Sequence, residues 1–168
     1  EYMTRLEKKA LAGFRIEDEE TAAAFAQYAS ENSLVDVTVF STDSKVLKTA
    51  CAGAPGIRGV LDFTGDMPEK TIDVVFDTNR SGARIAPTPA SAATRETVSY
   101  IQARAVPVWV QAAGDEMDTA ILAGADGIVT DDWTAALDAI EAYSSGEQVL
   151  TRPTVIVAHR GFHQTDPE

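Results

Sequence analysis

Short runs of β-branched residues alternate with amphipathic segments along most of this 168-residue chain. The apolar runs predict strands, and the segments between them have helical periodicity. The predicted strands are residues 35–40, 58–63, 83–86, 106–110, 127–130 and 154–158. The predicted helices are residues 21–30, 44–52, 68–79, 91–104, 115–123 and 132–143. Strict alternation requires parallel strands joined by right-handed crossovers, so the sequence predicts an α/β fold.

The ends of the strands favour a partial (β/α)8 TIM-barrel-like fold over a doubly wound sheet. Polar residues follow two strands directly, in Phe40-Ser41-Thr42-Asp43 and in Val129-Thr130-Asp131-Asp132. Such residues would line the carboxyl ends of the strands, where barrel enzymes carry their chemistry. No Gly-x-Gly-x-x-Gly pattern follows a strand, which removes the main support for a dinucleotide-binding sheet.

The last predicted helix has two features of its own. Trp133, Leu137 and Ile140 are spaced to form one stripe, which we expect to be buried. Asp131 and Asp132 form a carboxylate pair at a strand end that could hold a cation. Asp132 is also well placed to cap the helix that starts at Trp133, and capping is the favoured interpretation.

Charge and composition exclude several classes of protein. The chain has 26 acidic and 14 basic residues and a formal charge of −12, which argues against a nucleic-acid partner. No stretch approaches the roughly 18 apolar residues of a membrane span. Cys51 is the single cysteine, so no internal disulfide is expected, and its apolar neighbours indicate a core position on a helix.

Two motifs resemble the glycerophosphodiester phosphodiesterases. Members of that family open with an apolar strand running into Ala-His-Arg-Gly and then Pro-Glu-Asn-Thr; here Val157-Ala158-His159-Arg160-Gly161 is followed by Pro167-Glu168. They close with a Trp-containing strand, a helix and Gly-x-Asp-Gly-Ile-x-Thr-Asp; here Val108-Trp109-Val110 precedes Gly124-Ala125-Asp126-Gly127-Ile128-Val129-Thr130-Asp131. A weaker match is residues 37–43, which resemble a mid-barrel strand ending in Ser-Phe-Asp.

The resemblance implies a (β/α)8 barrel and a phosphoric diester hydrolase that acts on glycerophosphodiesters in lipid metabolism. The order of the motifs differs from the family, because Thr130 and Asp131 here precede His159. Residues 1–143 therefore resemble the C-terminal part of one barrel, residues 144–153 a linker, and residues 154–168 the first strand of a second barrel. Alternatively, residues 154–158 dock beside residues 127–130 and help to complete the same barrel.

The family's chemistry assigns roles to three residues by resemblance. His159 would transfer protons and Arg160 would bind the phosphoryl oxygens, because an arginine fork matches their geometry. Trp109 matches the tryptophan that lines the family's substrate cleft, although a core aromatic is an equal alternative. The partner implied is a glycerophosphodiester-type small molecule.

The family also uses a divalent cation, calcium or magnesium, held partly by a Glu-x-Asp pair. No such pair ends a predicted strand here. Glu17-Asp18-Glu19 precedes a predicted helix, so we interpret it as a solvated first turn. His163 is the only other histidine, and its spacing from His159 does not match the family's second histidine.

Three hypotheses follow for what the chain does. It is a fragment of a phosphodiesterase-like hydrolase that is itself inactive for lack of metal ligands, or a non-catalytic barrel that acts as a scaffold or binding module. The third is a half-barrel that covers its two unpaired edges by forming a homodimer.

Overall fold

The computed structural model describes residues 10–145, which form one curled parallel sheet with helices on its outside. Six strands lie in the order β1-β2-β3-β4-β5-β6, so each strand pairs with its neighbours in the sequence. The strands are β1 (Gly13–Arg15), β2 (Val37–Ser41), β3 (Ile57–Leu61), β4 (Ala83–Pro89), β5 (Val108–Gln111) and β6 (Gly127–Val129). This is an α/β partial TIM-barrel-like fold, a half-barrel with two unpaired edges among the residues described.

The helices follow the strands in regular alternation. They are α2 (Glu19–Glu31), α3 (Ser44–Gly53), α4 (Thr71–Arg80), α5 (Arg95–Gln102), α6 (Glu116–Ala123) and α7 (Trp133–Ser144), with a short 3-10 turn η1 (Ala90–Ala92) before α5. Amphipathic faces hold them on the sheet: Val46, Leu47 and Ala50 of α3 are fully buried or nearly so. None of the helices in residues 10–145 is long and apolar enough to cross a membrane.

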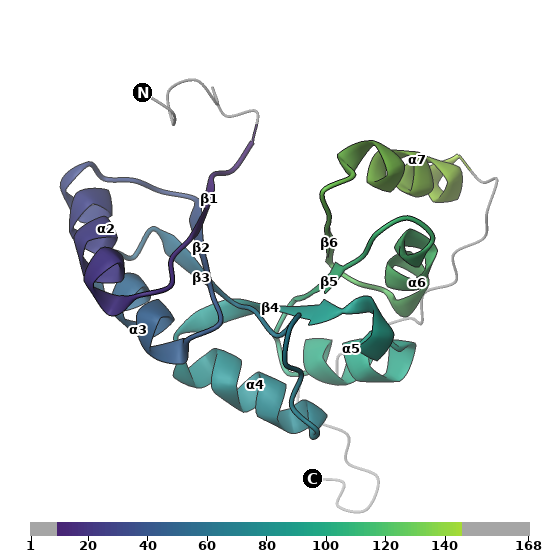
Figure 1. Ribbon diagram of the computed structural model, residues 1–168, viewed down its shortest axis with the longest axis horizontal. Coiled ribbons are helices and arrows are strands. Elements are labelled where there is room, and N and C mark those ends of the chain that lie inside the picture. Colours follow the sequence, from purple (N-terminus) through teal and green to yellow (C-terminus); the bar gives the residue numbers. More distant parts are fainter. Residues whose placement is uncertain (1–9, 146–168) are drawn as a thin grey trace, which may run out of the picture.

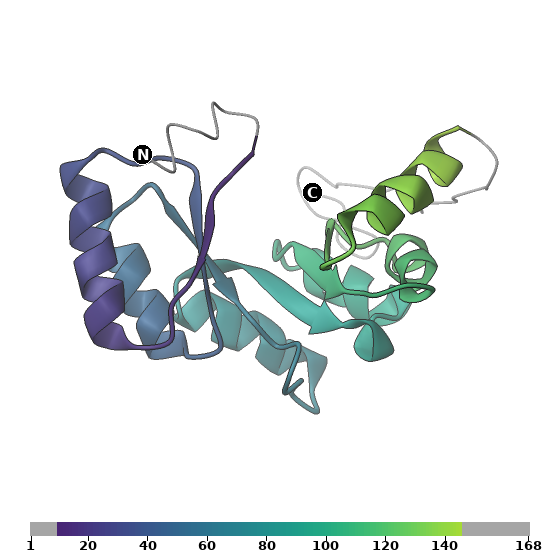
Figure 2. The same cartoon turned by 45° about the horizontal axis from the view of Figure 1, so that its top comes forward.

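Side chains alternate between the two faces of each strand, and the contacts show which face is which. Phe14 of β1 packs on Phe25 of α2, with ring centroids 4.9 Å apart, so Phe14 points outward to the helices. Arg15 and its lateral neighbour Phe40 therefore point to the opposite, concave side, here called the inner face. Figure 2 shows the helices outside the curved sheet, with β1 and β6 at its two ends.

The sequence predicted five of these strands and all six helices to within a few residues. Strand β1 was missed, because three residues that include a glycine and an arginine carry too weak a pattern. The interpretation of residues 17–19 needs correcting accordingly. They follow a strand as well as precede a helix, although Asp18 and Glu19 do form the solvated start of α2.

The prediction of a buried stripe on α7 was wrong for the residues that the structure describes. Trp133, Leu137 and Ile140 are 68%, 55% and 47% exposed. Their spacing does make one apolar face, which the buried Ala136 shares, but α7 packs mainly against α6 and the three large side chains of this face stay at least 47% exposed.

Close packing between β3 and its neighbours generates a prediction about Gly59. A Cβ atom at Gly59 would lie 2.8 Å from Sγ of Cys51 and 3.0 Å from Cα of Ala83. We expect Gly59→Ala to lower the free energy of unfolding by about 1–3 kcal/mol through overpacking, as measured by urea denaturation. Gly65→Ala is the matched control, because a Cβ there meets nothing within 4 Å. Equal midpoints for the two variants would contradict the packing at Gly59.

Candidate functional site

Two aromatic side chains face each other across the inner face. Phe40 of β2 and Trp109 of β5 have ring centroids 5.9 Å apart and planes tilted by 43°. Two strands, β3 and β4, separate them in the sheet, so they meet only because the sheet curls around its inner face. We call Phe40 and Trp109 the aromatic pair; each is partly buried.

Each ring of the aromatic pair lies over a glycine of an edge strand. A Cβ at Gly127 of β6 would be 2.8 Å from Cδ1 and 2.9 Å from Nε1 of Trp109. A Cβ at Gly13 of β1 would be 3.0 Å from Cε2 of Phe40. Because Gly127 and Gly13 carry no side chain, the rings can lie over both edges of the sheet.

Asp126, the residue before Gly127, joins β6 to β5. Its N–H donates to the carbonyl of Val108 (2.8 Å), and its carboxylate accepts from the N–H of Val108 (2.8 Å) and from Nε2 of Gln102 (2.9 Å). Gln102 also donates to the carbonyl of Gly124 (2.9 Å), and Gly124 ends α6 at φ 84°. The Gly-x-Asp-Gly part of the motif therefore has a structural role. Gly124 ends α6, Asp126 binds the backbone of β5, and Gly127 leaves room for the ring of Trp109.

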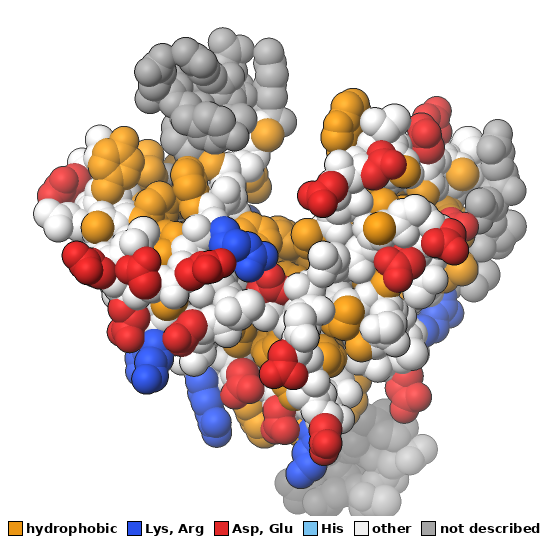
Figure 3. Space-filling view, in the orientation of Figure 1, with side chains coloured by type: hydrophobic (Ala, Val, Ile, Leu, Met, Phe, Trp, Pro, Cys, Tyr) orange, Lys and Arg blue, Asp and Glu red, His pale blue; other side chains and the backbone are white. Residues whose placement is uncertain are grey.

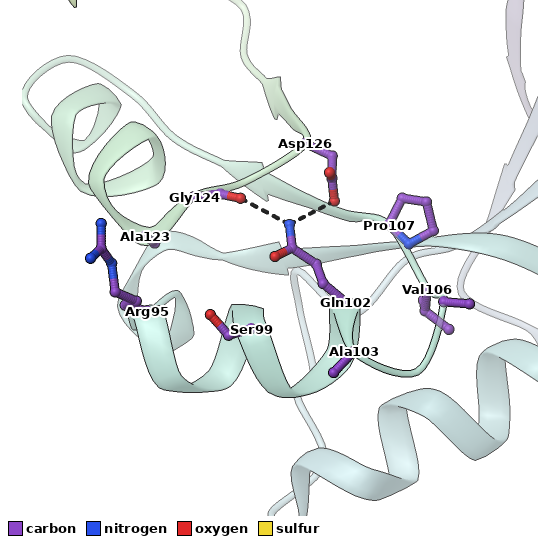
Figure 4. A pocket seen from close by; sticks show the side chains of 10 residues that line it. Arg95, Ser99, Gln102, Ala103, Val106, Pro107, Ala123, Gly124 and Asp126 are labelled. Atoms are coloured by element: carbon purple, nitrogen blue, oxygen red, sulfur yellow. Dashed lines mark hydrogen bonds between the residues drawn. The ribbon is translucent and has the colours of Figure 1, made fainter. Parts of the chain in front are cut away.

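Figure 4 shows this arrangement in a cavity of about 500 Å³. Arg95, Ser99, Gln102 and Asp126 line it, together with the segment that leads into β5. The cavity opens at the amino ends of β5 and β6. Barrel enzymes carry their active sites at the opposite end, where the carboxyl ends of the strands lie. We therefore interpret this cavity as a structural feature and not as an active site.

A second cavity lies at the carboxyl ends of β4, β5 and β6. It has a volume of about 370 Å³, and its lining includes Gln111, Glu116, Thr130 and Asp131. Asp132 also lines it, but its carboxylate accepts from the N–H of Ala135 (2.9 Å), which confirms Asp132 as the cap of α7.

An ion pair links the carboxyl ends of β1 and β3. Nη2 of Arg15 donates to Oδ2 of Asp62 (2.7 Å), which follows β3, while Oδ1 accepts from the hydroxyl (2.6 Å) and N–H (2.9 Å) of Thr64. The Asp62 side chain is 5% exposed and that of Arg15 is 52% exposed. Burial by itself would raise the pKa of Asp62. The hydrogen bonds from Thr64 and the pairing with Arg15 outweigh burial and lower that pKa below its ordinary value of 3.8.

The carboxylates at the strand ends do not form a cation site. Within residues 10–145, no three side chains of the types His, Cys, Asp and Glu gather closely enough to hold a metal ion. Asp62 is bound by Arg15 and Thr64, and Asp43 caps α3 through the N–H of Lys45 (2.7 Å). These residues therefore do not fit the divalent cation that the resemblance implied.

Of the predicted site residues, the structure places Trp109 on the inner face, where it contacts Phe40. His159, Arg160 and His163 lie outside the described residues, as does the predicted strand at 154–158. Sequence reasoning missed Phe40, Arg15 and Asp62 as inner-face residues. Alternation along β2 could have put Phe40 on one face of its strand, but no local signal pairs it with Trp109.

Solved structures with the same fold were found, whereas no protein-family model and no curated protein matches this sequence. A glycerophosphodiester phosphodiesterase from Parabacteroides distasonis is 14% identical, with a TM-score of 0.66 over 88% of this chain and 63% of that one. A phosphodiesterase from Oleispira antarctica, solved with the product sn-glycerol-3-phosphate, is 20% identical, with a TM-score of 0.59 over 73% of this chain and 50% of that one. The chain has the fold of part of a glycerophosphodiester phosphodiesterase barrel.

The chain spans less than two thirds of the length of these two phosphodiesterase structures. At such identities the agreement is one of fold. A protein from Toxoplasma gondii assigned as a deoxyribose-phosphate aldolase shares the fold as well, with 15% identity and a TM-score of 0.57 over 82% of this chain and 69% of that one. The fold alone therefore does not identify the chemistry, which depends on the residues of the site.

The glycine beneath Trp109 generates a prediction. In a Trp133→Phe background, which leaves Trp109 as the only tryptophan, we expect Gly127→Ala to displace the indole. Tryptophan emission should shift to longer wavelength, and the free energy of unfolding should fall by about 1–3 kcal/mol. Gly65→Ala in the same background is the control. An unchanged emission spectrum in Gly127→Ala would show that the ring does not lie over β6.

The Arg15–Asp62 pair predicts a pH dependence. Because the pKa of Asp62 is lowered in the folded chain, its contribution to stability is full above the unfolded value of 3.8 and is lost as pH falls through the folded pKa. Asp62→Asn should cost about 1–3 kcal/mol at neutral pH. The difference between wild type and variant should shrink below about pH 4. Urea denaturation at pH 7, 5, 4 and 3 measures this, and a difference that grows toward acid would contradict the assignment.

Proposed function

We propose that this half-barrel belongs to a phosphoric diester hydrolase that cleaves glycerophosphodiesters, and that it forms one side of the substrate site. The supporting observation is the aromatic pair on the inner face. Figure 3 shows hydrophobic side chains at the base of the hollow between the two arms of the molecule. Trp109 is the residue that the motif match also selects, and a similar structure holds sn-glycerol-3-phosphate.

The aromatic pair suits the apolar part of such a substrate. A glycerol backbone presents C–H groups that pack on an indole face, while its phosphate needs donors that neutralise the non-bridging oxygens. Within the proposal, Arg160 supplies those donors and His159 transfers the proton to the leaving alkoxide. The phosphorus–oxygen bond to the leaving group breaks, water adds its oxygen to phosphorus, and the products are an alcohol and glycerol phosphate.

The chain by itself is expected to hydrolyse little. A divalent cation in the complete enzyme, calcium or magnesium, would need ligands beyond the strand-end carboxylates described above, since no three such side chains of residues 10–145 lie close enough together to hold one. The proposed activity is therefore that of a complete barrel, to which this chain contributes Trp109, His159 and Arg160.

A second candidate is a non-catalytic module that binds a glycerophosphate or acts as a scaffold. The observation that favours it is the same use of strand-end carboxylates as helix caps and ion-pair partners, which leaves a hollow with an aromatic side and few groups for chemistry.

Binding and turnover separate the two candidates. The hydrolase and the binding module both predict that the 168-residue chain binds sn-glycerol-3-phosphate by calorimetry, and that Trp109→Ala weakens binding at least about fivefold. Tyr28→Ala, an exposed aromatic on the outer helix α2, is the control and should bind as wild type does. No binding at millimolar ligand would overturn both and leave only the scaffold role.

Turnover is measured with bis(p-nitrophenyl) phosphate and added calcium or magnesium. We expect the chain to release p-nitrophenol at close to the uncatalysed rate. Metal-dependent cleavage that is lost in His159→Ala would show that this chain is itself the enzyme and would overturn the assignment of metal ligands to other residues. Completion of the barrel with the missing strands should raise the rate if the hydrolase proposal holds, and should leave it unchanged for a binding module.

A further inference from the structure

Strand β6 and helix α7 together leave a surface uncovered by residues 10–145. The outer edge of β6 has no partner strand in the part of the chain that the structure describes, and all three of its residues are only partly buried. By contrast, strands β2 and β3 have neighbours on both sides and are mostly buried. An unpaired edge exposes N–H and C=O groups that can pair with a further strand.

The apolar face of α7 lies over this end of the sheet. Trp133, Leu137 and Ile140 occupy three successive turns and are between 47% and 68% exposed. Ala136, which lies on the same face of α7 between them, is buried, so this face is covered only in part. Three large exposed apolar residues in one line on a helix indicate a face that packs against something in the complete fold.

A cavity of about 310 Å³ lies between β6, α6 and α7. Its lining includes Ile121, Gly127, Ile128, Ile140 and Tyr143. Ile140 thus takes part in both the cavity and the exposed stripe, so the two features are continuous. Strand β6 forms one border of this space through Gly127 and Ile128.

We propose that residues 154–158 of this same chain form a parallel strand on the outer edge of β6, under the apolar face of α7. The run Thr154-Val155-Ile156-Val157-Ala158 has no charge and is rich in β-branched residues. A continuous apolar run of this kind is typical of a parallel strand that is buried on both faces. In a barrel, one face packs in the interior and the other packs against a helix.

Chain direction and length agree with this position. Helix α7 starts just after the carboxyl end of β6 and runs back, so its last residue, Ser144, lies toward the end of the sheet where a parallel strand has to begin. Every crossover so far advances the sheet in one direction, from β1 to β6, and a right-handed crossover places the next strand beyond β6. Residues 146–153 connect the two, with a reach of about 3.3 Å per residue.

A strand at this position would also bring the His-Arg-Gly motif to the sheet. This position does not depend on the proposed function, but it would place His159 and Arg160, which follow the run directly, at the carboxyl ends of the strands. That is the end at which Thr130 and Asp131 line the 370 Å³ cavity. A strand from a second copy of the chain is the competing occupant, and the test separates it from the cis strand.

The experiment measures hydrogen exchange of the Gly127–Val129 amides in the full 168-residue chain by mass spectrometry. We expect exchange in Ile156→Pro to be at least about tenfold faster than in wild type, because proline removes a donor and breaks the strand. Gln164→Pro, the same change beyond the run, is the control and should exchange as wild type does. Light scattering should give a monomer throughout.

A second pair of variants tests the α7 face without touching the terminal run. Leu137→Gln and Asp138→Gln both change exposed residues of α7, but only Leu137 is on the apolar stripe. We expect Leu137→Gln to speed exchange at Gly127–Val129 several-fold and Asp138→Gln to leave it unchanged. This pair decides the matter if Ile156→Pro also loses protection in β2, which would mean that the variant has failed to fold.

Three results would overturn the inference. The first is rapid exchange at Gly127–Val129 in wild type. The second is protection that Leu137→Gln leaves intact. The third is a dimer in which protection is lost on dilution, which would assign the edge to a second copy. Each is distinguishable from failure of the proposed function, because none of these measurements involves a ligand or turnover.

Discussion

The contact between Phe40 and Trp109 ties together the two arms of the half-barrel. A flat sheet would hold β2 and β5 three strand spacings apart, well beyond the reach of two side chains. The 5.9 Å between the ring centroids therefore reports the curvature directly. Gly13 and Gly127 permit this arrangement, because a side chain at either position would occupy the space that the neighbouring ring fills. The curvature of the sheet, the position of the two rings and the glycines at both edges therefore depend on one another.

The same packing explains why the strand-end carboxylates are structural. Strands β2 and β6 pass into helices within a few residues, and the first N–H groups of a helix need acceptors. Asp43 and Asp132 provide them, and Asp62 is bound by Arg15 and Thr64 on the inner side. Among residues 10–145, these carboxylates do not gather into a cluster that could hold a cation. The chemistry proposed for the complete barrel accordingly depends on groups outside these loops.

Local patterns in the sequence predicted the alternation of strands and helices well, because each long element carries its own periodicity. Strand β1 was missed since Gly13–Arg15 is held by pairing with β2 and by Phe14 packing on α2, neither of which is a local property. The meeting of Phe40 with Trp109 was missed for the same reason. On α7 the pattern identified an apolar face correctly but not its partner, since periodicity shows which side of a helix is apolar and not what covers it.

A closed barrel has no first strand in the physical sense, because every strand has two neighbours and the ring of hydrogen bonds is continuous. Chain order decides only where the ring is cut. A motif that opens the barrel in one protein can follow the last helix in another and still occupy the same place beside the same strand. The His-Arg-Gly motif after α7 is therefore compatible with the barrel to which β6 belongs. The exposed face of α7 and the free edge of β6 are the features that a strand arriving in this order would cover.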